Sequence, residues 1–228
     1  MFQTNFTEKE MISELTSKML IEVNAVKFNV DVPFKFTSGW TSPVYIDCRK
    51  LISYPKARST LINFCSEIIV KKIGLEKVES LVGGETAGIP FAAFLANQLE
   101  LPMHYVRKKP KGFGVNSHIE GNSIKGKKVV LIEDLTTDGG SKIKFCDSIR
   151  NAGAEVEETI VLFYYNIFDH VPEKLKKSGI NLNYLACWWD ILNYCKEDNS
   201  IIDNETISQI EQFLISPKEW SKNHTNKI

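Results

Sequence analysis

Hydrophobic residues recur along this chain at two spacings, and each spacing predicts a different kind of element. Helical spacing from Thr7 to about Val26 predicts an amphipathic N-terminal helix, with Thr7 and Glu10 as a capping box. The same spacing predicts a helix from Lys56 to Ile73 that ends at Gly74. The other expected helices are Phe91–Leu99, one that opens at Ser141, Ile191–Cys195 and Thr206–Leu214.

Short segments rich in apolar residues predict strands, and the clearest of them, Val129–Ile132, is four consecutive apolar residues that predict a strand buried on both faces. The other expected strands are Val78–Val82, His104–Val106, Thr159–Tyr164 and Leu182–Ala186. Buried runs of this kind are typical of parallel sheets, and here they alternate with the expected helices. The pattern therefore predicts an α/β fold with a mostly parallel sheet of about five strands flanked by helices.

Aromatic and β-branched residues from Val32 to Arg49 surround a Ser-Gly and a Ser-Pro pair, which predicts a β-hairpin. With 228 residues, the chain has the length of one integrated globular unit. Within it we expect an N-terminal helix and hairpin over 1–50, a core over 51–200 and a helical tail over 201–228.

Composition narrows the class of protein. Lys and Arg number 28, as do Asp and Glu, so no net charge draws the chain to nucleic acid or to an anionic membrane. The five cysteines are scattered without a C-x-x-C pair, which favours a reducing compartment. The N-terminus lacks a basic region followed by an apolar core, and no apolar run reaches about 18 residues. We therefore expect a cytoplasmic protein.

The stretch from Val129 to Ser141 carries the clearest chemistry. Two carboxylates, Glu133 and Asp134, are expected to end the strand, and a run of hydroxyl, acidic and glycine residues then leads to Ser141 as a helix N-cap. Glycines and a helix start suit a phosphate group, whereas the two acids suit ribose hydroxyls. An ordinary capped strand-to-helix connection would share much of this pattern, so other motifs must decide.

Two further segments point to anion binding. Gly83–Pro90 is a second glycine-rich turn between a strand and a helix, expected at the same edge of the sheet. Arg107–Gly121 opens with four cations in five positions and has neither helical nor strand periodicity. This basic loop is either a solvated charge run or a lid whose cations close over phosphates, and its length favours a lid.

These segments together resemble the orotate phosphoribosyltransferases, a group of type I phosphoribosyltransferases. The acids and the hydroxyl and glycine run after them are similar to the motif that binds phosphoribosyl pyrophosphate (PRPP). The hairpin matches the F-x-x-x-S-G-x-x-S-P-x-Y-x-D-x-R signature of the family's hood, the Gly83–Pro90 turn resembles its pyrophosphate loop, and the basic loop resembles its flexible catalytic loop. The resemblance covers roughly residues 30 to 215.

The resemblance implies transfer of a phosphoribosyl group from PRPP to orotate, giving orotidine 5′-monophosphate and pyrophosphate in pyrimidine synthesis. Mg²⁺ is implied, held mainly through PRPP and not by a direct side-chain ligand. The implied catalytic residues are Lys111, Asp134, Glu133 and Lys108. Those implied for PRPP are Arg107, Lys108, Lys111, Glu133, Asp134, Leu135, Thr136, Thr137, Asp138, Gly139, Gly140, Ser141, Glu85 and Thr86; those for orotate are Thr137, Phe34, Tyr45 and Arg49. The family also implies a homodimer in which the basic loop completes the partner's site.

The chain departs from the family pattern at two places. Many members carry a His two residues beyond the loop Lys, but Phe113 stands here, so either Lys111 alone supports the leaving group or His118 takes part. Some members have an Arg after the strand that begins near Thr159, and this chain has none there. Thr137, backbone N–H groups and the hairpin are then left to bind the orotate carboxylate.

Two alternatives remain at this point. The chain could act on another base, although the hairpin signature argues against it. It could also be a PRPP-sensing regulator without catalysis, but no DNA-binding helix-turn-helix pattern or basic excess supports a nucleic-acid surface.

Overall fold

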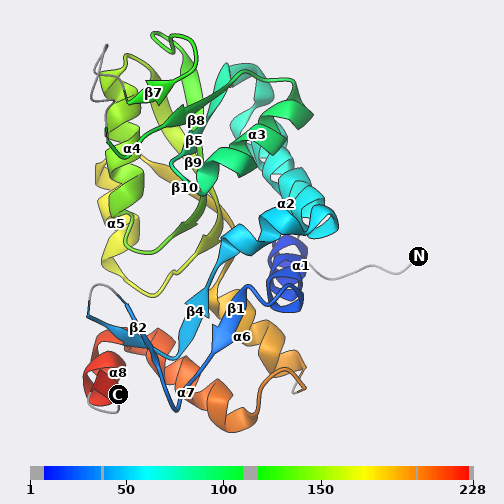
Figure 1. Ribbon diagram of the computed structural model, residues 1–228, viewed down its shortest axis with the longest axis vertical. Helices are drawn as coiled ribbons and strands as arrows, with labels where there is room; N and C mark the ends of the chain where they lie inside the picture. Colours follow the sequence, from blue (N-terminus) through cyan, green and yellow to red (C-terminus); the bar gives the residue numbers. More distant parts are fainter. Residues whose placement is uncertain (1–7, 37–38, 110–117, 199, 226–228) are drawn as a thin grey trace. The chain divides into compact units, whose positions relative to one another are not determined.

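The computed structural model describes residues 8–36, 39–109, 118–198 and 200–225 (Figure 1). By its internal contacts the chain divides into two units, Met1–Leu51 with Ala186–Ile228, and Ile52–Leu185. The larger unit is one continuous stretch of the chain, whereas the smaller unit combines the N-terminal and C-terminal stretches. The division into 1–50, 51–200 and 201–228 stays a prediction.

A six-stranded sheet organises the described part of the larger unit, in the order β10-β9-β8-β5-β6-β7. Its strands are β5 (Ser80–Gly84), β6 (Met103–Val106), β7 (Ile119–Glu120), β8 (Lys128–Thr136), β9 (Glu155–Tyr164) and β10 (Asn181–Cys187). Strand β5 runs parallel to β6 and β8, and β8 runs parallel to β9, whereas β7 is antiparallel to β6. The mostly parallel sheet is confirmed, with the short edge strand β7 in addition to the five expected strands.

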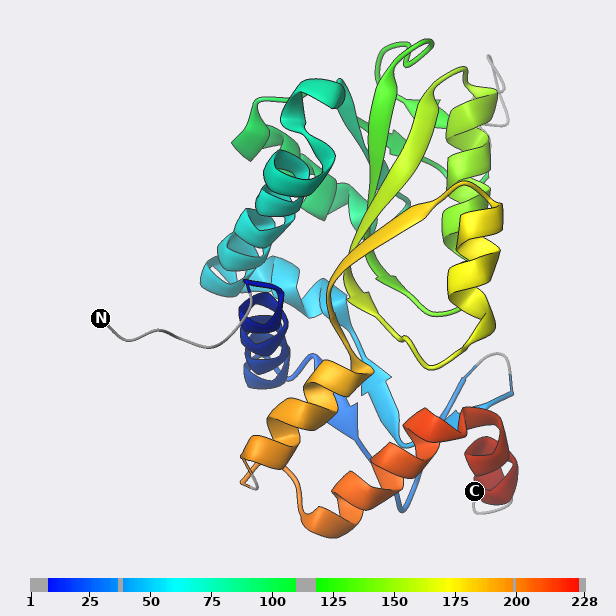
Figure 2. The same ribbon diagram turned by 180° about the vertical axis from the view of Figure 1, so that it is seen from behind.

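Helices cover both faces of this sheet, as Figures 1 and 2 show. Helices α2 (Pro55–Glu67) and α3 (Gly88–Leu99) lie on one face, and α4 (Gly140–Asn151) and α5 (His170–Lys177) lie on the other. A π-helical segment, Ile68–Ile73, continues α2 and stops at Gly74, whose φ of 92° suits glycine. A short 3₁₀ turn, Leu75–Lys77, follows.

The core explains why the expected strands were visible as apolar runs. Strand β5 is buried at every position, and β9 is buried from Thr159 to Tyr164. Helices α4 and α5 contribute Phe145, Ile149, Val171 and Leu175 to a cluster with residues of these strands. Because helices cover both faces, no alternation of polar residues is needed in the central strands.

The smaller unit contains α1 (Glu8–Glu22), β1 (Val26–Phe28), β2 (Phe34–Lys35), β3 (Thr41–Ser42) and β4 (Val44–Ile46). A 3₁₀ helix, Cys48–Ser53, leads out of it. Its C-terminal part contains α6 (Trp188–Glu197), α7 (Asn204–Ile215) and α8 (Pro217–His224). The sequence pattern had placed α6 and α7 but not α8.

The hairpin prediction needs a correction. β2 and β3 form the expected antiparallel pair, but β4 pairs with β1, a strand that the pattern did not predict and whose first residue, Val26, it had placed at the end of the first helix. Helix α1 ends at Glu22, and Ala25 N–H donates to the carbonyl of Leu20, so the chain turns into a strand that β4 can pair.

Helix α8 is bound to the hairpin by buried hydrogen bonds. The backbone N–H of Thr41 donates to Ser221 Oγ at 2.9 Å, and the Thr41 hydroxyl donates to the Ser221 carbonyl at 3.0 Å. The C-terminal helix is thus part of the packing of this unit.

Two observations concern membrane-spanning helices and the state of the cysteines. None of the helices in the described residues is long and apolar enough to cross a bilayer. The five cysteines are all free thiols, and all are buried.

Candidate active site

The stretch that the sequence singled out lies where the strand order reverses. The chain leaves β5 for β6 on one side and leaves β8 for β9 on the other, so the ends of β5 and β8 meet at a switch point. Crevices at such points, beyond the carboxyl ends of the strands, are where open α/β sheets bind ligands. The turn after β8 (Thr136–Ser141, here the Gly139 turn) and the turn after β5 (Gly83–Pro90, the Gly84 turn) both begin there.

Strand β8 extends further than expected. It continues to Thr136 because its backbone stays paired with β9 as far as Tyr164. Glu133 and Asp134 therefore lie inside the strand and are not the residues that end it, and both are buried. The expectation that the carboxylates terminate the strand is wrong, but they still lie at its carboxyl end.

The helix start also differs from the expectation. The N-cap of α4 is Gly139 at φ 75°, and the helix begins at Gly140, so Ser141 is not the cap. Asp138, which precedes the cap, accepts through its Oδ1 from the backbone N–H of Gly140, the first helical residue, at 3.1 Å. A side chain at Gly139 would be strained and would lie 2.8 Å from a methyl group of Leu175, so glycine is required there.

Lys174, on α5, supports the Gly139 turn from outside. Its ammonium donates to the carbonyl of Asp138 at 2.9 Å and lies 3.6 Å from the Asp138 carboxylate. Burial acts to raise the pKa of Asp138, but the Gly140 N–H and Lys174 outweigh it and hold that pKa below its usual value. Asp138 and Ser141 are exposed and Thr137 is half-buried, so N–H and hydroxyl groups of the turn are accessible.

Glu133 has two partners on two other elements. Its Oε2 lies 2.6 Å from the ammonium of Lys142, and its Oε1 accepts from the backbone N–H of Gly88 at 3.0 Å. Burial raises the pKa of Glu133 to about 7, against the attraction of Lys142 and the Gly88 N–H, which lower it. Asp134, its neighbour, accepts from the backbone N–H of Leu135 at 2.8 Å.

The Gly84 turn is joined to the start of the basic loop. Glu85 Oε2 accepts from the backbone N–H of Lys108 at 2.7 Å, and the Glu85 N–H donates to the carbonyl of Val106 at 2.9 Å. Glu85 thus stands beside Lys108, and both are among the residues named for PRPP. Thr86 accepts from the backbone N–H of Ile89 at the start of α3, at 3.4 Å.

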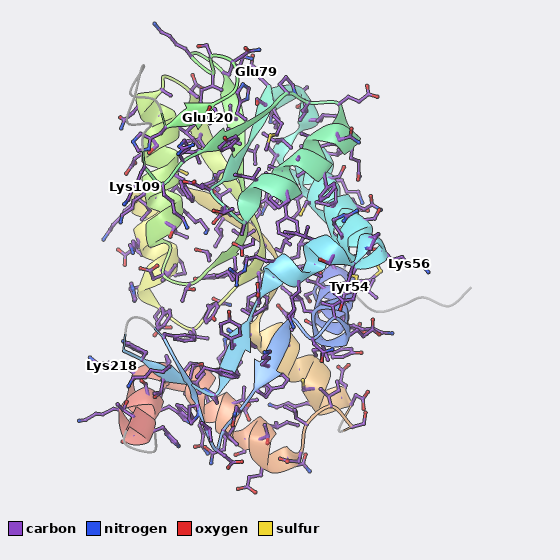
Figure 3. The ribbon with its side chains drawn as sticks, viewed as in Figure 1. Tyr54, Lys56, Glu79, Lys109, Glu120 and Lys218 are labelled. Atoms are coloured by element: carbon purple, nitrogen blue, oxygen red, sulfur yellow. The ribbon has the colours of Figure 1, made fainter. Side chains whose placement is uncertain are left out.

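The two ends of the basic loop contact each other. Arg107 N–H donates to the carbonyl of His118 at 2.7 Å, and His118 Nδ1 lies 3.1 Å from the carbonyl of Arg107, to which it can only donate. The Arg107 guanidinium lies 3.5 Å from Glu120 (Figure 3 labels Glu120 and, at the other end of the loop, Lys109). Lys111 and Phe113 lie outside the described residues.

The hairpin residues named for orotate lie in the smaller unit. The rings of Phe34 and Tyr45 are 5.6 Å apart between centroids and tilted by 39°. Arg49 forms a two-pronged ion pair with Asp47, at 2.6 and 3.0 Å, and this pairing outweighs partial burial to hold the pKa of Asp47 below its usual value. The structure therefore brings Phe34 and Tyr45 together and gives Arg49 a carboxylate partner.

Sequence reasoning missed Lys142 and Lys174. Lys142 is nevertheless visible in the pattern, because it occupies the same helical stripe as Phe145, Cys146 and Ile149. A lysine on the apolar face of a helix must bury its charge, and such a charge needs a partner. Lys174 lies 36 residues from the carbonyl it binds, and no local signal connects the two.

Comparison with known proteins agrees with this geometry. The family model for the phosphoribosyl transferase domain matches residues 56–191. An orotate phosphoribosyltransferase of Sinorhizobium medicae is 51% identical over 221 residues, which are 97% of this chain and 95% of that protein. An orotate phosphoribosyltransferase of Ruegeria is 47% identical and is covered over 98% of its length.

Solved structures give the same result. The crystal structure of an orotate phosphoribosyltransferase from Aeropyrum pernix matches with a TM-score of 0.69 and 31% identity, over 79% of this chain and 98% of that one. The UMP synthase of Leishmania donovani matches with a TM-score of 0.75 and 26% identity over 88% of this chain, which spans 42% of that longer protein. The fold, the two turns at the switch point and the relatives together show that the chain belongs to the orotate phosphoribosyltransferases of the phosphoribosyltransferase family.

Proposed function

We propose that this chain transfers the 5-phosphoribosyl group of PRPP to orotate and releases pyrophosphate and orotidine 5′-monophosphate. The observation that carries the proposal is the pair of glycine turns at the ends of the parallel strands β5 and β8, in a chain 51% identical to an orotate phosphoribosyltransferase. The function accounts for both turns, since PRPP carries a phosphate at one end of its ribose and a pyrophosphate at the other.

The Gly139 turn is the proposed site for the 5′-phosphate. It offers the start of α4, with its unpaired N–H groups and partial positive charge, together with the hydroxyls of Thr137 and Ser141. In the structure Asp138 accepts the Gly140 N–H, so a phosphate bound there would take over that donor. Lys174 adds a positive charge behind the turn.

The Gly84 turn and the start of the basic loop are the proposed site for the pyrophosphate. Glu85 holds the backbone of Lys108 next to this turn, which brings the cationic segment to it. Arg107 and Lys108, with Lys111 from outside the described residues, would balance the negative charge that develops on the leaving oxygen. His118 donates to the carbonyl of Arg107, which makes Lys111 the better candidate for supporting the leaving group.

Breaking the bond between the anomeric carbon and pyrophosphate also builds positive charge on the ribose ring. The acidic pair lies at the carboxyl end of β8, where its negative charge would stabilise that ring. Both Glu133 oxygens already have partners, Lys142 and the Gly88 N–H, so Asp134 is the proposed acceptor for the ribose hydroxyls. Orotate is already acidic, so its attacking nitrogen needs little help from a protein base. Thr137, Phe34, Tyr45 and Arg49 stay the proposed contacts of the base.

Mg²⁺ is proposed to arrive with PRPP, bound to its phosphate oxygens. Glu133 does not fit a role as its ligand, because the Glu133 carboxylate is already paired with an ammonium group at 2.6 Å. In the residues that the structure describes, no three His, Cys, Asp or Glu side chains form a metal-binding group. When bound, the ion would supply charge neutralisation for the leaving pyrophosphate.

Two finer features rest on the family resemblance. We propose a homodimer in which the basic loop of each subunit completes the other's site. We also propose a cytoplasmic location, which the five free thiols support, since reducing compartments keep thiols unpaired.

The direct test is pyrophosphate release by the purified chain with PRPP, Mg²⁺ and a panel of bases. Orotate should support release, and uracil, adenine and hypoxanthine should not. Release with another base but not with orotate would overturn the base assignment. Tight PRPP binding without release with any base would favour the sensing regulator.

A further inference from the structure

Lys142 carries a charge that the proposed reaction does not use. Its side chain is 5% exposed, and that of Glu133 is 7% exposed, so the two charges are almost wholly removed from water. A buried ammonium group is costly unless it is paired and hydrogen-bonded, and here its described partner is the Glu133 carboxylate at 2.6 Å. Lys142 follows the Gly139 turn on α4, so this bond ties that helix to β8.

Glu133 extends the same connection to the other face of the sheet. Its second oxygen accepts from the backbone N–H of Gly88, the first residue of α3. Helices α3 and α4 lie on opposite faces of the sheet (Figures 1 and 2). The single Glu133 carboxylate joins the starts of both helices to β8. The Gly139 turn and the Gly84 turn are therefore linked through a single side chain.

Two glycines leave the room that this side chain occupies. A Cβ added at Gly84 would lie 2.8 Å from the Glu133 carboxyl carbon, and one at Gly88 would lie 2.6 Å from Glu133 Oε1. Neither glycine has a positive φ, so the backbone alone does not require glycine at these positions. At Gly84 the Glu133 side chain requires it, and at Gly88 the carbonyl oxygen of Ile132, which a Cβ would overlap, requires it together with Glu133 Oε1. The acid and the two glycines are therefore packed against one another.

We propose, resting on the function proposed above, that Lys142 is a positioning residue that holds Glu133 across the two turns and leaves Asp134 to contact the ribose of PRPP. Adjacent residues of a strand direct their side chains to opposite faces, so the two acids of the motif can hold different partners. Glu133 then sets the spacing of the two turns, and thus of the phosphate and pyrophosphate sites. Misplacing reacting groups by about 1 Å can lower a rate on the order of 10²-fold.

The test is a double-mutant cycle between Glu133→Gln and Lys142→Met, with Lys144→Met as the matched control. Lys144 is an exposed lysine on the same helix. Each single change at Glu133 or Lys142 should lower kcat on the order of 10- to 100-fold with little change in the KM of orotate. The double variant should be no slower than the slower single variant, because both changes break the same connection. Lys144→Met should behave as wild type.

Two results would overturn the proposal. One is a Lys142→Met protein that is folded at the assay temperature and has wild-type kcat; the other is a double variant whose loss equals the product of the two single losses. If Lys142→Met does not fold, the double variant still tests the proposal, because it buries no unpaired charge. A double variant with wild-type kcat would equally reject the role of the Glu133–Lys142 pair.

A readout without catalysis separates this inference from the proposed function. Exchange of the Gly88 amide hydrogen, followed by NMR, should be at least tenfold faster in Lys142→Met than in Lys144→Met, because the Glu133 acceptor is no longer held. A second outcome is that wild type releases no pyrophosphate from PRPP and orotate while Gly88 exchange still changes in this way. That result would reject the proposed function and support the connection from Lys142 through Glu133 to Gly88. Unchanged Gly88 exchange in an active enzyme would reject the connection alone.

Discussion

Glu85 accepts a hydrogen bond from the backbone N–H of Lys108 at 2.7 Å, and this contact fixes the first residues of the basic loop beside the Gly84 turn. At the opposite end of β5, Glu79 makes a bond of the same kind to the backbone N–H of Lys128, the first residue of β8, at 2.8 Å. The two acids are thus chemically alike, but only Glu85 is next to the proposed pyrophosphate site (Figure 3 labels Glu79).

This pair gives a controlled prediction. Glu85→Ala should lower kcat/KM for PRPP on the order of tenfold or more, because the cations of the loop are no longer held beside the turn. Glu79→Ala removes an equivalent bond far from the site and should leave kcat/KM unchanged. Steady-state kinetics with varied PRPP measures both, and equal losses in the two variants would reject a special role for Glu85.

Gly88→Ala should destabilise the protein through steric overlap. The new methyl group would overlap the carbonyl oxygen of Ile132 and lie 2.6 Å from Glu133 Oε1. Overpacking of this kind costs about 1–3 kcal/mol in the free energy of unfolding. Gly126→Ala is the contrasting variant, because Gly126 has φ 77° and open space around it, so a methyl group there meets backbone strain but no steric overlap. The midpoints of thermal unfolding of both variants are compared with that of wild type. A Gly88→Ala protein as stable as wild type would show that the Gly84 turn shifts to accommodate the methyl group.

Lys111→Ala should lower turnover by about 10²–10³-fold while PRPP binding stays nearly intact, since its charge is needed mainly as the leaving oxygen becomes negative. Lys109→Ala removes a neighbouring cation that is assigned no role and serves as the control. Turnover is measured as pyrophosphate release, and PRPP affinity is measured by calorimetry. An undiminished rate in Lys111→Ala would remove this residue from the mechanism.

A loop shared between subunits predicts complementation. Lys111→Ala and Asp134→Ala subunits should each be inactive, but a mixed dimer has one site with an intact loop from one subunit and an intact acid from the other. Mixing after mild unfolding should restore up to about a quarter of wild-type activity per total subunit, since half of the dimers are mixed and each has one intact site of two. Size-exclusion chromatography checks the dimer, and a mixture that stays inactive would place the loop in its own subunit's site.

Stability should depend on pH through Glu133. Its pKa is about 7 in the folded chain and near the ordinary 4.5 when unfolded, so between these values the folded state holds a proton that the unfolded state has lost. The contribution is fully present below pH 4.5 and is lost as pH rises to about 7. Urea unfolding of wild type and of the Glu133→Gln, Lys142→Met double variant should show this fall only in wild type; parallel curves would contradict it.

Much of the fold and of the family followed from local pattern. The buried runs at Val129–Ile132 and Thr159–Tyr164 lie in β8 and β9, and the helix expected to stop at Gly74 does so. Boundaries were less accurate where pairing decided them: β8 continues through both acids because β9 pairs with it there. Strand β1 was missed for the same reason, since its partner β4 follows it only after the hairpin.

The sequence by itself determined the α/β class, the two glycine turns and the acidic pair, because hydrophobic periodicity and the positions of glycines and acids are local properties of the chain. Only the tertiary structure decided what those groups touch. That Glu133 faces Lys142 and Gly88, that Lys174 supports the Gly139 turn and that Glu85 holds Lys108 depend on residues distant in sequence. Such contacts form when folding brings distant segments of the chain together, and no local pattern shows which residues will meet. For the buried charges of Glu133 and Lys142, burial then requires a partner.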